Sequence, residues 1–111
     1  MDIQEFIKCQ KEFDKQYDCL KKWTEIINQN NVDVLEFLSI GLAGEVGETC
    51  NIVKKIVRGD CTIVDVKDHL TEELIDVFIY ILKLLSQLEI NVEEEYKKKL
   101  KANAKKFGRK E

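Results

Sequence analysis

The chain has 111 residues, with 18 basic and 21 acidic side chains and a net charge of −3. It contains no proline, and 35% of its residues are charged, a composition dominated by helix-forming residues. These values predict one all-α domain over residues 1–111 and argue against nucleic acid as the main partner. No apolar run reaches membrane-spanning length and no signal peptide is evident, so we expect a cytoplasmic protein with no membrane partner.

The first predicted helix runs from about Ile3 to Ile27, where apolar residues recur at helical spacing. The polar run Asn28–Asn31 predicts a loop. A second helix is predicted over Val34–Val57, with Asp33 as its N-cap. The sequence Arg58-Gly59-Asp60 is expected to end it, because glycine commonly follows a basic last turn.

A third helix is predicted over Ile63–Leu88 and is apolar on nearly every side after Glu73, as expected for a buried helix. Asn91 opens a fourth helix with a variant of the capping box, and Gly108 closes it. The short links predict an antiparallel four-helix bundle. Because a 111-residue monomer offers little cover for so apolar a helix, we expect a homodimer or homotetramer.

Four cysteines lack the paired spacing of zinc sites, and His69 is the single histidine. We therefore expect free thiols at all four positions, which are Cys9, Cys19, Cys50 and Cys61.

Two acidic pairs carry the chemistry that this sequence suggests. Glu45 and Glu48 are three residues apart, share one helix face and interrupt the apolar stripe of the second helix. Glu73 and Asp76 repeat that spacing on the third helix, in a narrow polar stripe that also holds Tyr80. Four carboxylates that converge between two helices need a counter-charge, which a hard cation such as Mg²⁺ supplies. The alternatives are a surface acidic pair and ordinary amphipathicity.

Three glycines lie beside the first acidic pair, at Gly41, Gly44 and Gly47. A glycine inside a helix costs about 1 kcal/mol relative to alanine. They predict close approach of another helix or a ligand, with a local break in the helix as the alternative.

On the fourth helix, Asn103 lies in an apolar stripe, and Lys99 and Lys106 flank it. An amide with lysines beside it is suited to holding a phosphate or a base edge. A solvated and frayed helix end is the alternative.

In this order and spacing, the two motifs resemble those of the MazG-like, all-α nucleoside triphosphate pyrophosphohydrolases, a superfamily that includes dCTP pyrophosphatases and dimeric dUTPases. The resemblance spans about residues 35–107. It rests on Gly-Leu-Ala-Gly-Glu45-Val-Gly-Glu48 and on Glu-Glu73-Leu-Ile-Asp76-Val-Phe-Ile-Tyr80.

The resemblance implies a Mg²⁺ site formed by Glu45, Glu48, Glu73 and Asp76. It also implies that Tyr80 lines the nucleoside pocket and that Lys99 and Asn103 reach the triphosphate. Two positions depart from the pattern. Gly44 stands where many members carry a further glutamate, and Lys55 where dCTP-type relatives tend to place an aromatic ring over the base.

The expected activity is Mg²⁺-dependent hydrolysis of a nucleoside triphosphate, most simply a deoxynucleotide, to the monophosphate and pyrophosphate. Glu48 is the expected general base. Two other functions stay open: an enzyme like phosphoribosyl-ATP pyrophosphohydrolase, and a non-enzymatic helical interaction or regulatory protein. A substrate panel separates the first, and failure to bind Mg²⁺ would favour the second.

Overall fold

The computed structural model describes residues 1–17 and 22–108. In these ranges the chain is helical and has no strand, which confirms the all-α prediction. Its elements are α1 (Ile3–Tyr17), the short 3₁₀ turn η1 (Gln29–Asn31), α2 (Val32–Val57), α3 (Ile63–Gln87) and α4 (Val92–Phe107). None of the described helices is long and apolar enough to span a lipid bilayer.

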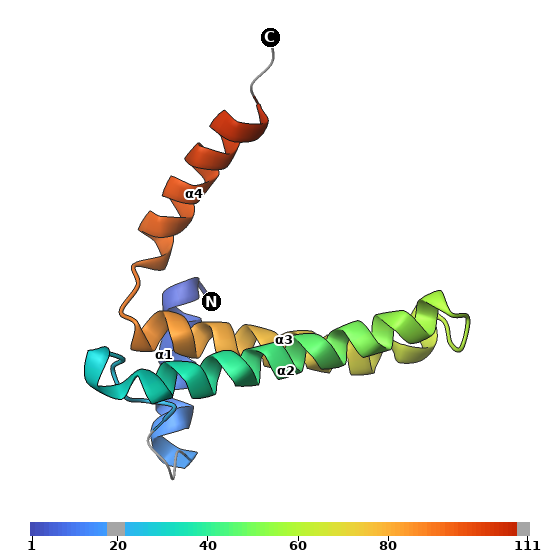
Figure 1. The fold of residues 1–111 in the computed structure, drawn as a ribbon, viewed down its shortest axis with the longest axis horizontal. Helices are drawn as coiled ribbons and strands as arrows, with labels where there is room; N and C mark the ends of the chain where they lie inside the picture. Colours follow the sequence, from blue (N-terminus) through green and yellow to red (C-terminus); the bar gives the residue numbers. More distant parts are fainter. Residues whose placement is uncertain (18–21, 109–111) are drawn as a thin grey trace.

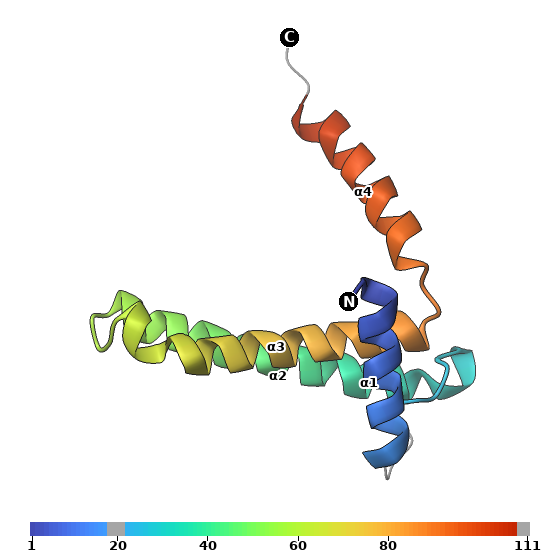
Figure 2. The same cartoon turned by 180° about the vertical axis from the view of Figure 1, so that it is seen from behind.

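The centre of the molecule is an antiparallel hairpin of α2 and α3, which lie side by side along their length (Figure 1). Gly59 lets the chain reverse between them, because its φ of +86° lies in the region that glycine adopts readily. Thr62 and Asp65 then start α3 with reciprocal side-chain and backbone hydrogen bonds. Helix α1 crosses α3 near the end of the hairpin (Figure 2).

Helix α4 stands apart from the hairpin and packs along none of the other described helices (Figures 1 and 2). Asn91 caps it as predicted, since its side chain accepts a hydrogen bond from the backbone of Glu94 at 3.1 Å. The radius of gyration is 17.2 Å, whereas a compact domain of this size has about 13 Å. The predicted four-helix bundle is therefore not closed within one chain.

The apolar surface of α3 is only partly covered. The buried apolar core consists of Leu82 on α3 and Val34, Leu38 and Ile52 on α2. In contrast, Leu74 and Ile75 in the middle of α3 are each 51% exposed. The prediction that the third helix is buried is thus wrong for the single chain, because α1 and α2 cover only part of it.

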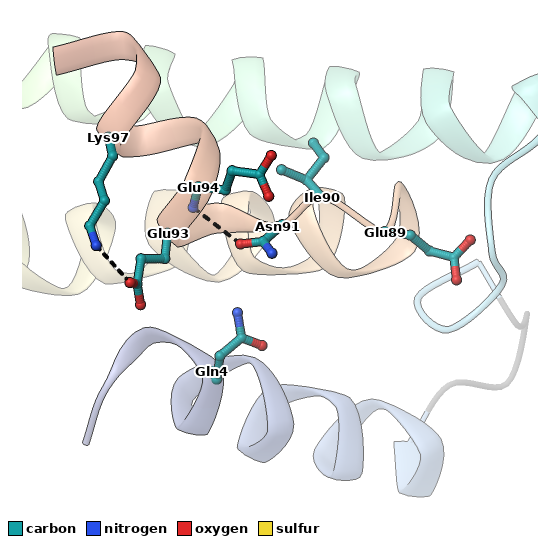
Figure 3. Close-up of a pocket in the computed structure, with 7 residues that line it drawn as sticks. All are labelled: Gln4, Glu89, Ile90, Asn91, Glu93, Glu94 and Lys97. Carbon is teal, nitrogen blue, oxygen red and sulfur yellow. Dashed lines mark hydrogen bonds and ion pairs between the residues drawn. The ribbon is translucent and has the colours of Figure 1, made fainter. Parts of the chain in front are cut away.

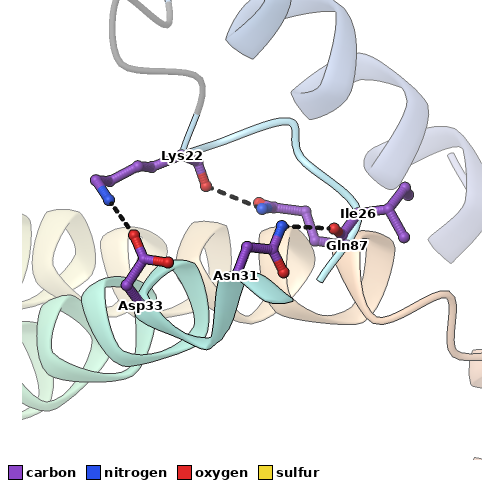
Figure 4. A network of polar contacts seen from close by, with 5 residues as sticks. All are labelled: Lys22, Ile26, Asn31, Asp33 and Gln87. Carbon is purple, nitrogen blue, oxygen red and sulfur yellow. Dashed lines mark hydrogen bonds and ion pairs between the residues drawn. The ribbon is translucent and has the colours of Figure 1, made fainter. Parts of the chain in front are cut away.

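The first helix ends earlier than predicted. Residues 22–27 form turns and irregular chain, and the predicted positions 18–21 lie outside the described residues. The physical reason is an anchor on α3, where the Gln87 side chain donates to the carbonyl of Lys22 at 2.9 Å (Figure 4). The same amide donates to the carbonyl of Glu25 at 2.8 Å. The backbone of Ile27 also donates to the Gln87 carbonyl, at 2.8 Å. These backbone groups bond to α3 instead of to a helix of their own.

Helix α2 begins two residues before the predicted start, so Asp33 is not its N-cap. Asn28 and Asn31 instead exchange hydrogen bonds within the preceding 3₁₀ turn, and Asn31 also donates to the carbonyl of Ile26 at 2.9 Å (Figure 4). Asp33 pairs with Lys22 at 3.0 Å, and this hydrogen bond and the lysine charge lower the pKa of Asp33. Cys9, Cys50 and Cys61 are free thiols as predicted, and Cys19 lies outside the described residues.

Candidate metal centre

The carboxylates predicted to bind metal meet between the two arms of the hairpin. One oxygen each from Glu45 on α2 and from Glu73 and Asp76 on α3 lie within 4.8 Å of one another. Opposite ligands in an octahedral Mg²⁺ site are separated by about 4.2 Å, given bonds of about 2.1 Å. The three oxygens therefore lie near the spacing that one hard cation requires, and small side-chain adjustments would complete it.

Two of these carboxylates each bury an oxygen that has no partner. Glu45 Oε2 and Glu73 Oε2 are shielded from solvent and accept no hydrogen bond within the described structure. An ionised carboxylate can accept hydrogen bonds but cannot donate one, so these two oxygens cannot bond to each other when both groups are charged. An unpaired buried charge is unfavourable, and a cation between the two oxygens would compensate it. The donor set thus fits a hard divalent ion.

The neighbouring carboxylates change the protonation behaviour of Glu73. A hydrogen bond with Glu48, burial, and the neighbouring Glu45 raise the pKa of Glu73 from 4.5 to about 7. The cause is that a proton on Glu73 both relieves like-charge repulsion and supplies a donor to the adjacent carboxylates. A bound cation would perform the same task.

Glu48 lies beside this group but is not one of its three members. It is within hydrogen-bonding reach of Glu73 and is exposed to solvent. The structure therefore brings all four predicted carboxylates into one cluster, with Glu48 at its edge.

His69 is a neighbour that the sequence interpretation left without a role. Its Nε2 lies 3.3 Å from Glu73 Oε1, and the imidazole is largely exposed. The signal was present in the sequence, since residues four apart on a helix share a face. A histidine at this distance can orient the carboxylate that it contacts.

Tyr80 lies against the same cluster. Burial, Glu45 and Asp76 raise the pKa of its phenol. A Cβ on Gly41 would come within 2.6 Å of the Tyr80 ring, so the ring packs directly on the glycine. This confirms the close approach predicted for Gly41, and α2 continues through all three glycines without the alternative break. A Cβ added at the other two glycines, Gly44 and Gly47, would meet nothing within 4 Å.

Lys99 and Asn103 lie on α4, away from the hairpin that carries the carboxylates (Figure 1). Within one chain, the structure does not bring these two residues to the candidate metal centre.

A separate hollow lies between the start of α1 and the start of α4 (Figure 3). Its lining includes Gln4 and three glutamates, one of which, Glu93, pairs with Lys97 at 2.9 Å. The clustered carboxylates of the hairpin are not part of it. Beside them is a different open hollow, lined by Thr71, Glu72, Glu73, Ile75 and Asp76.

Fold and site together define an all-α protein with a candidate divalent-cation centre. A scan against models of known protein families finds no match, and a search of solved structures finds none either. The chain is similar to the protein called "Gene 37 protein" of Mycobacterium phage L5, with 36% identity over 63 residues. The match covers 55% of each chain, so the chain spans about half the length of this relative.

Proposed function

We propose that the protein is a Mg²⁺-dependent nucleoside triphosphate pyrophosphohydrolase, which converts a ribo- or deoxyribonucleoside triphosphate into the monophosphate and pyrophosphate. The observation that carries the proposal is the meeting of Glu45, Glu73 and Asp76, with Glu48 beside them, between α2 and α3. The resemblance of the two acidic motifs to MazG-like enzymes supplies the reaction class.

In this proposal Glu45, Glu73 and Asp76 hold the cation. Mg²⁺ held by these residues would supply positive charge that neutralises the phosphates and makes the attacking water more acidic. Glu48 remains outside the three-residue group, so its carboxylate is free to accept the proton of the attacking water. Tyr80 borders the carboxylates and lies where it can contact the nucleoside.

Attack of water at the α-phosphorus breaks the bond to the bridging oxygen, which leaves with pyrophosphate, while the proton passes to Glu48. The sequence has no Gly-rich phosphate loop of the P-loop kind. Recognition of the triphosphate therefore falls to the cation and to lysines. In the family pattern, Lys99 and Asn103 have this role.

The test is a panel of nucleoside triphosphates and phosphoribosyl-ATP incubated with Mg²⁺ and separated by chromatography. We expect monophosphate and pyrophosphate from at least one nucleoside triphosphate. Nucleoside diphosphate and orthophosphate as the only products would reject the proposal. Hydrolysis of phosphoribosyl-ATP alone would instead identify an enzyme like phosphoribosyl-ATP pyrophosphohydrolase. No turnover, together with no effect of Mg²⁺ on the melting temperature, would favour the non-enzymatic function.

We further propose that the active form is a homodimer or homotetramer. Apolar side chains are exposed along the hairpin and along α4, with Val64 86% and Phe107 67% exposed. Packing of a second copy on these surfaces would complete a helical bundle and bring a partner's α4 to the carboxylates. Light scattering at micromolar concentration tests this, and a monomeric mass for the fully active protein would contradict it.

A further inference from the structure

Lys83 is a buried cation on α3, about two helical turns after Asp76 of the candidate metal centre. Its side chain is only 6% exposed, and its Nζ lies 3.8 Å from Asp14 Oδ1 on α1. The same ammonium group lies over two aromatic rings, 3.8 Å from the ring centroid of Trp23 and 5.2 Å from that of Tyr80. One lysine therefore joins α1, the irregular segment before α2, and α3.

A buried lysine at this position calls for a physical explanation. Burial of an ion pair often contributes no more stability than a well-packed apolar pair, because both charges lose their hydration. A cation is attracted to the faces of aromatic rings, so it favours one orientation of the rings around it. Lys83 thus fixes how the rings of Trp23 and Tyr80 lie, in addition to filling space.

Tyr80 has two close neighbours. Its ring lies on Gly41 of α2, where no side chain separates the two helices. The ring is also near Lys83, almost one turn further along α3. The charges of Glu45 and Asp76 act on the phenol. The ring therefore lies between the carboxylate cluster and the buried lysine.

Trp23 is also fixed by α3. The Gln87 side chain binds the carbonyl of the preceding residue, Lys22, and the carbonyl of Glu25 two residues later. Gln87 is 2% exposed and lies one turn after Lys83, so both contacts come from one face of α3. The backbone around Trp23 and its ring are positioned by the same helix face.

We propose that Lys83 is a positioning residue that holds the Tyr80 and Trp23 rings together as one wall beside the carboxylates, against which the nucleoside part of the substrate binds. This inference rests on the proposed hydrolase function and adds a determinant of nucleoside binding to it. Lys83 is buried between the rings and Asp14, so it acts through Tyr80 and Trp23 and does not touch the phosphates.

Three variants test this. Lys83→Arg keeps a cation that stacks on aromatic rings. The double change Asp14→Asn with Lys83→Met removes both charges of this ion pair together. Trp23→Leu removes one ring and keeps the ion pair. Lys54→Met, on the exposed part of α2, is the matched control for a lysine-to-methionine change.

We expect the double variant and Trp23→Leu each to raise KM for the nucleoside triphosphate about tenfold, with kcat within about twofold of the wild type. The inhibition constant of inorganic tripolyphosphate, which has no nucleoside, should stay unchanged in both. Lys83→Arg should restore most of the wild-type KM, and Lys54→Met should match the wild type. Trp23 is the single tryptophan, so its emission should shift in the double variant and return towards the wild type in Lys83→Arg.

A folded double variant, checked by circular dichroism, with wild-type KM would overturn the inference. So would unchanged KM in Trp23→Leu, an equal loss of tripolyphosphate binding, or unaltered Trp23 emission. These results are distinct from failure of the proposed function, in which the wild-type protein itself would neither hydrolyse nor bind any nucleoside triphosphate with Mg²⁺.

Discussion

The α2–α3 hairpin and α4 differ in how far their charged side chains are buried. In the hairpin, Glu45 and Glu73 each bury an oxygen without a hydrogen-bond partner. On α4, the pair formed by Lys97 and Glu93 is largely exposed to solvent, with more than 70% of each side chain exposed. Buried charge is unfavourable unless something compensates it, whereas exposed pairs contribute little to stability.

The two regions also differ in how their apolar faces are covered. Residues of α2 and α3 bury part of their apolar surface against each other, but the apolar residues of α4 are exposed, with Tyr96 62%, Leu100 50% and Phe107 67% exposed. The hairpin therefore holds the clustered carboxylates, whereas α4 exposes its apolar side chains in the single chain. Four experiments probe this contrast.

The largest effect is expected in the hairpin, at the proposed general base. Glu48→Gln should lower kcat by about 100-fold or more, because the amide cannot accept the proton of the attacking water. The metal-free variant should be as stable as the wild type or more so, since one charge leaves the repulsive cluster. Pyrophosphate assays and thermal melts with and without Mg²⁺ measure both effects.

Glu36→Gln is the control, because Glu36 is exposed and lies about half a turn round α2 from Glu45. It should leave kcat unchanged. If Glu48→Gln keeps wild-type turnover and the full Mg²⁺-dependent rise in melting temperature, Glu48 lies outside the site.

The next effect tests whether α4 acts on the hairpin of another copy. Lys99→Ala with Asn103→Ala should raise KM and leave the fold intact, since α4 stands apart from the α2–α3 hairpin (Figure 1). Mixed dimers of this chain with a Glu48→Gln chain, purified through two tags, should regain about half of the wild-type activity, because one of the two sites is intact.

That recovery requires α4 to reach the partner's carboxylates. If α4 acts within its own chain, each chain of the mixed dimer contains one defect and no site is intact. Activity no higher than the sum of the two parent variants would then reject the intersubunit arrangement.

A third effect concerns pH and the hairpin alone. The fold raises the pKa of Glu73 from its ordinary 4.5 to about 7. The folded chain therefore binds a proton more tightly, and the stability of the metal-free protein should fall as pH rises through that interval. Mg²⁺ replaces this proton, so it should raise the melting temperature more at pH 8 than at pH 5.

Two other carboxyls change stability in the opposite direction but at lower pH. Hydrogen bonds lower the pKa values of Asp33 and Asp65 below 3.8, so their contribution is lost only on strong acidification. Thermal melts in chelator between pH 5 and pH 8 thus avoid the range in which Asp33 and Asp65 titrate. Glu73→Gln should flatten the profile, and a flat wild-type profile would contradict the raised pKa.

The sequence predicted the helices well where local signals decide them. The end of α2 at Val57, the start of α3 at Ile63 and the cap at Asn91 all agree with the structure. The carboxylate cluster could also be predicted from the sequence, because residues three apart share a helix face and both acidic pairs have this spacing.

Tertiary contacts explain what the sequence did not predict. The segment that contains Trp23 has helical periodicity. However, the side chain of Gln87, more than 60 residues later, donates hydrogen bonds to backbone carbonyls of this segment. The exposure of Leu74 could likewise not be predicted, because it depends on how much of α3 the rest of the chain covers. Neither feature produces a local sequence pattern.

The smallest expected effect compares two glycines of one helix, which differ only in what lies above them. At Gly44 an added Cβ meets nothing within 4 Å, so Gly44→Ala should stabilise the protein by about 1 kcal/mol through helix propensity. At Gly41 the Cβ would come within 2.6 Å of the Tyr80 ring, so Gly41→Ala should lose that gain and raise KM as Tyr80 shifts. Urea unfolding and steady-state kinetics of the pair measure this. Equal stabilisation by both alanines, with unchanged KM, would show that Tyr80 is not held against α2.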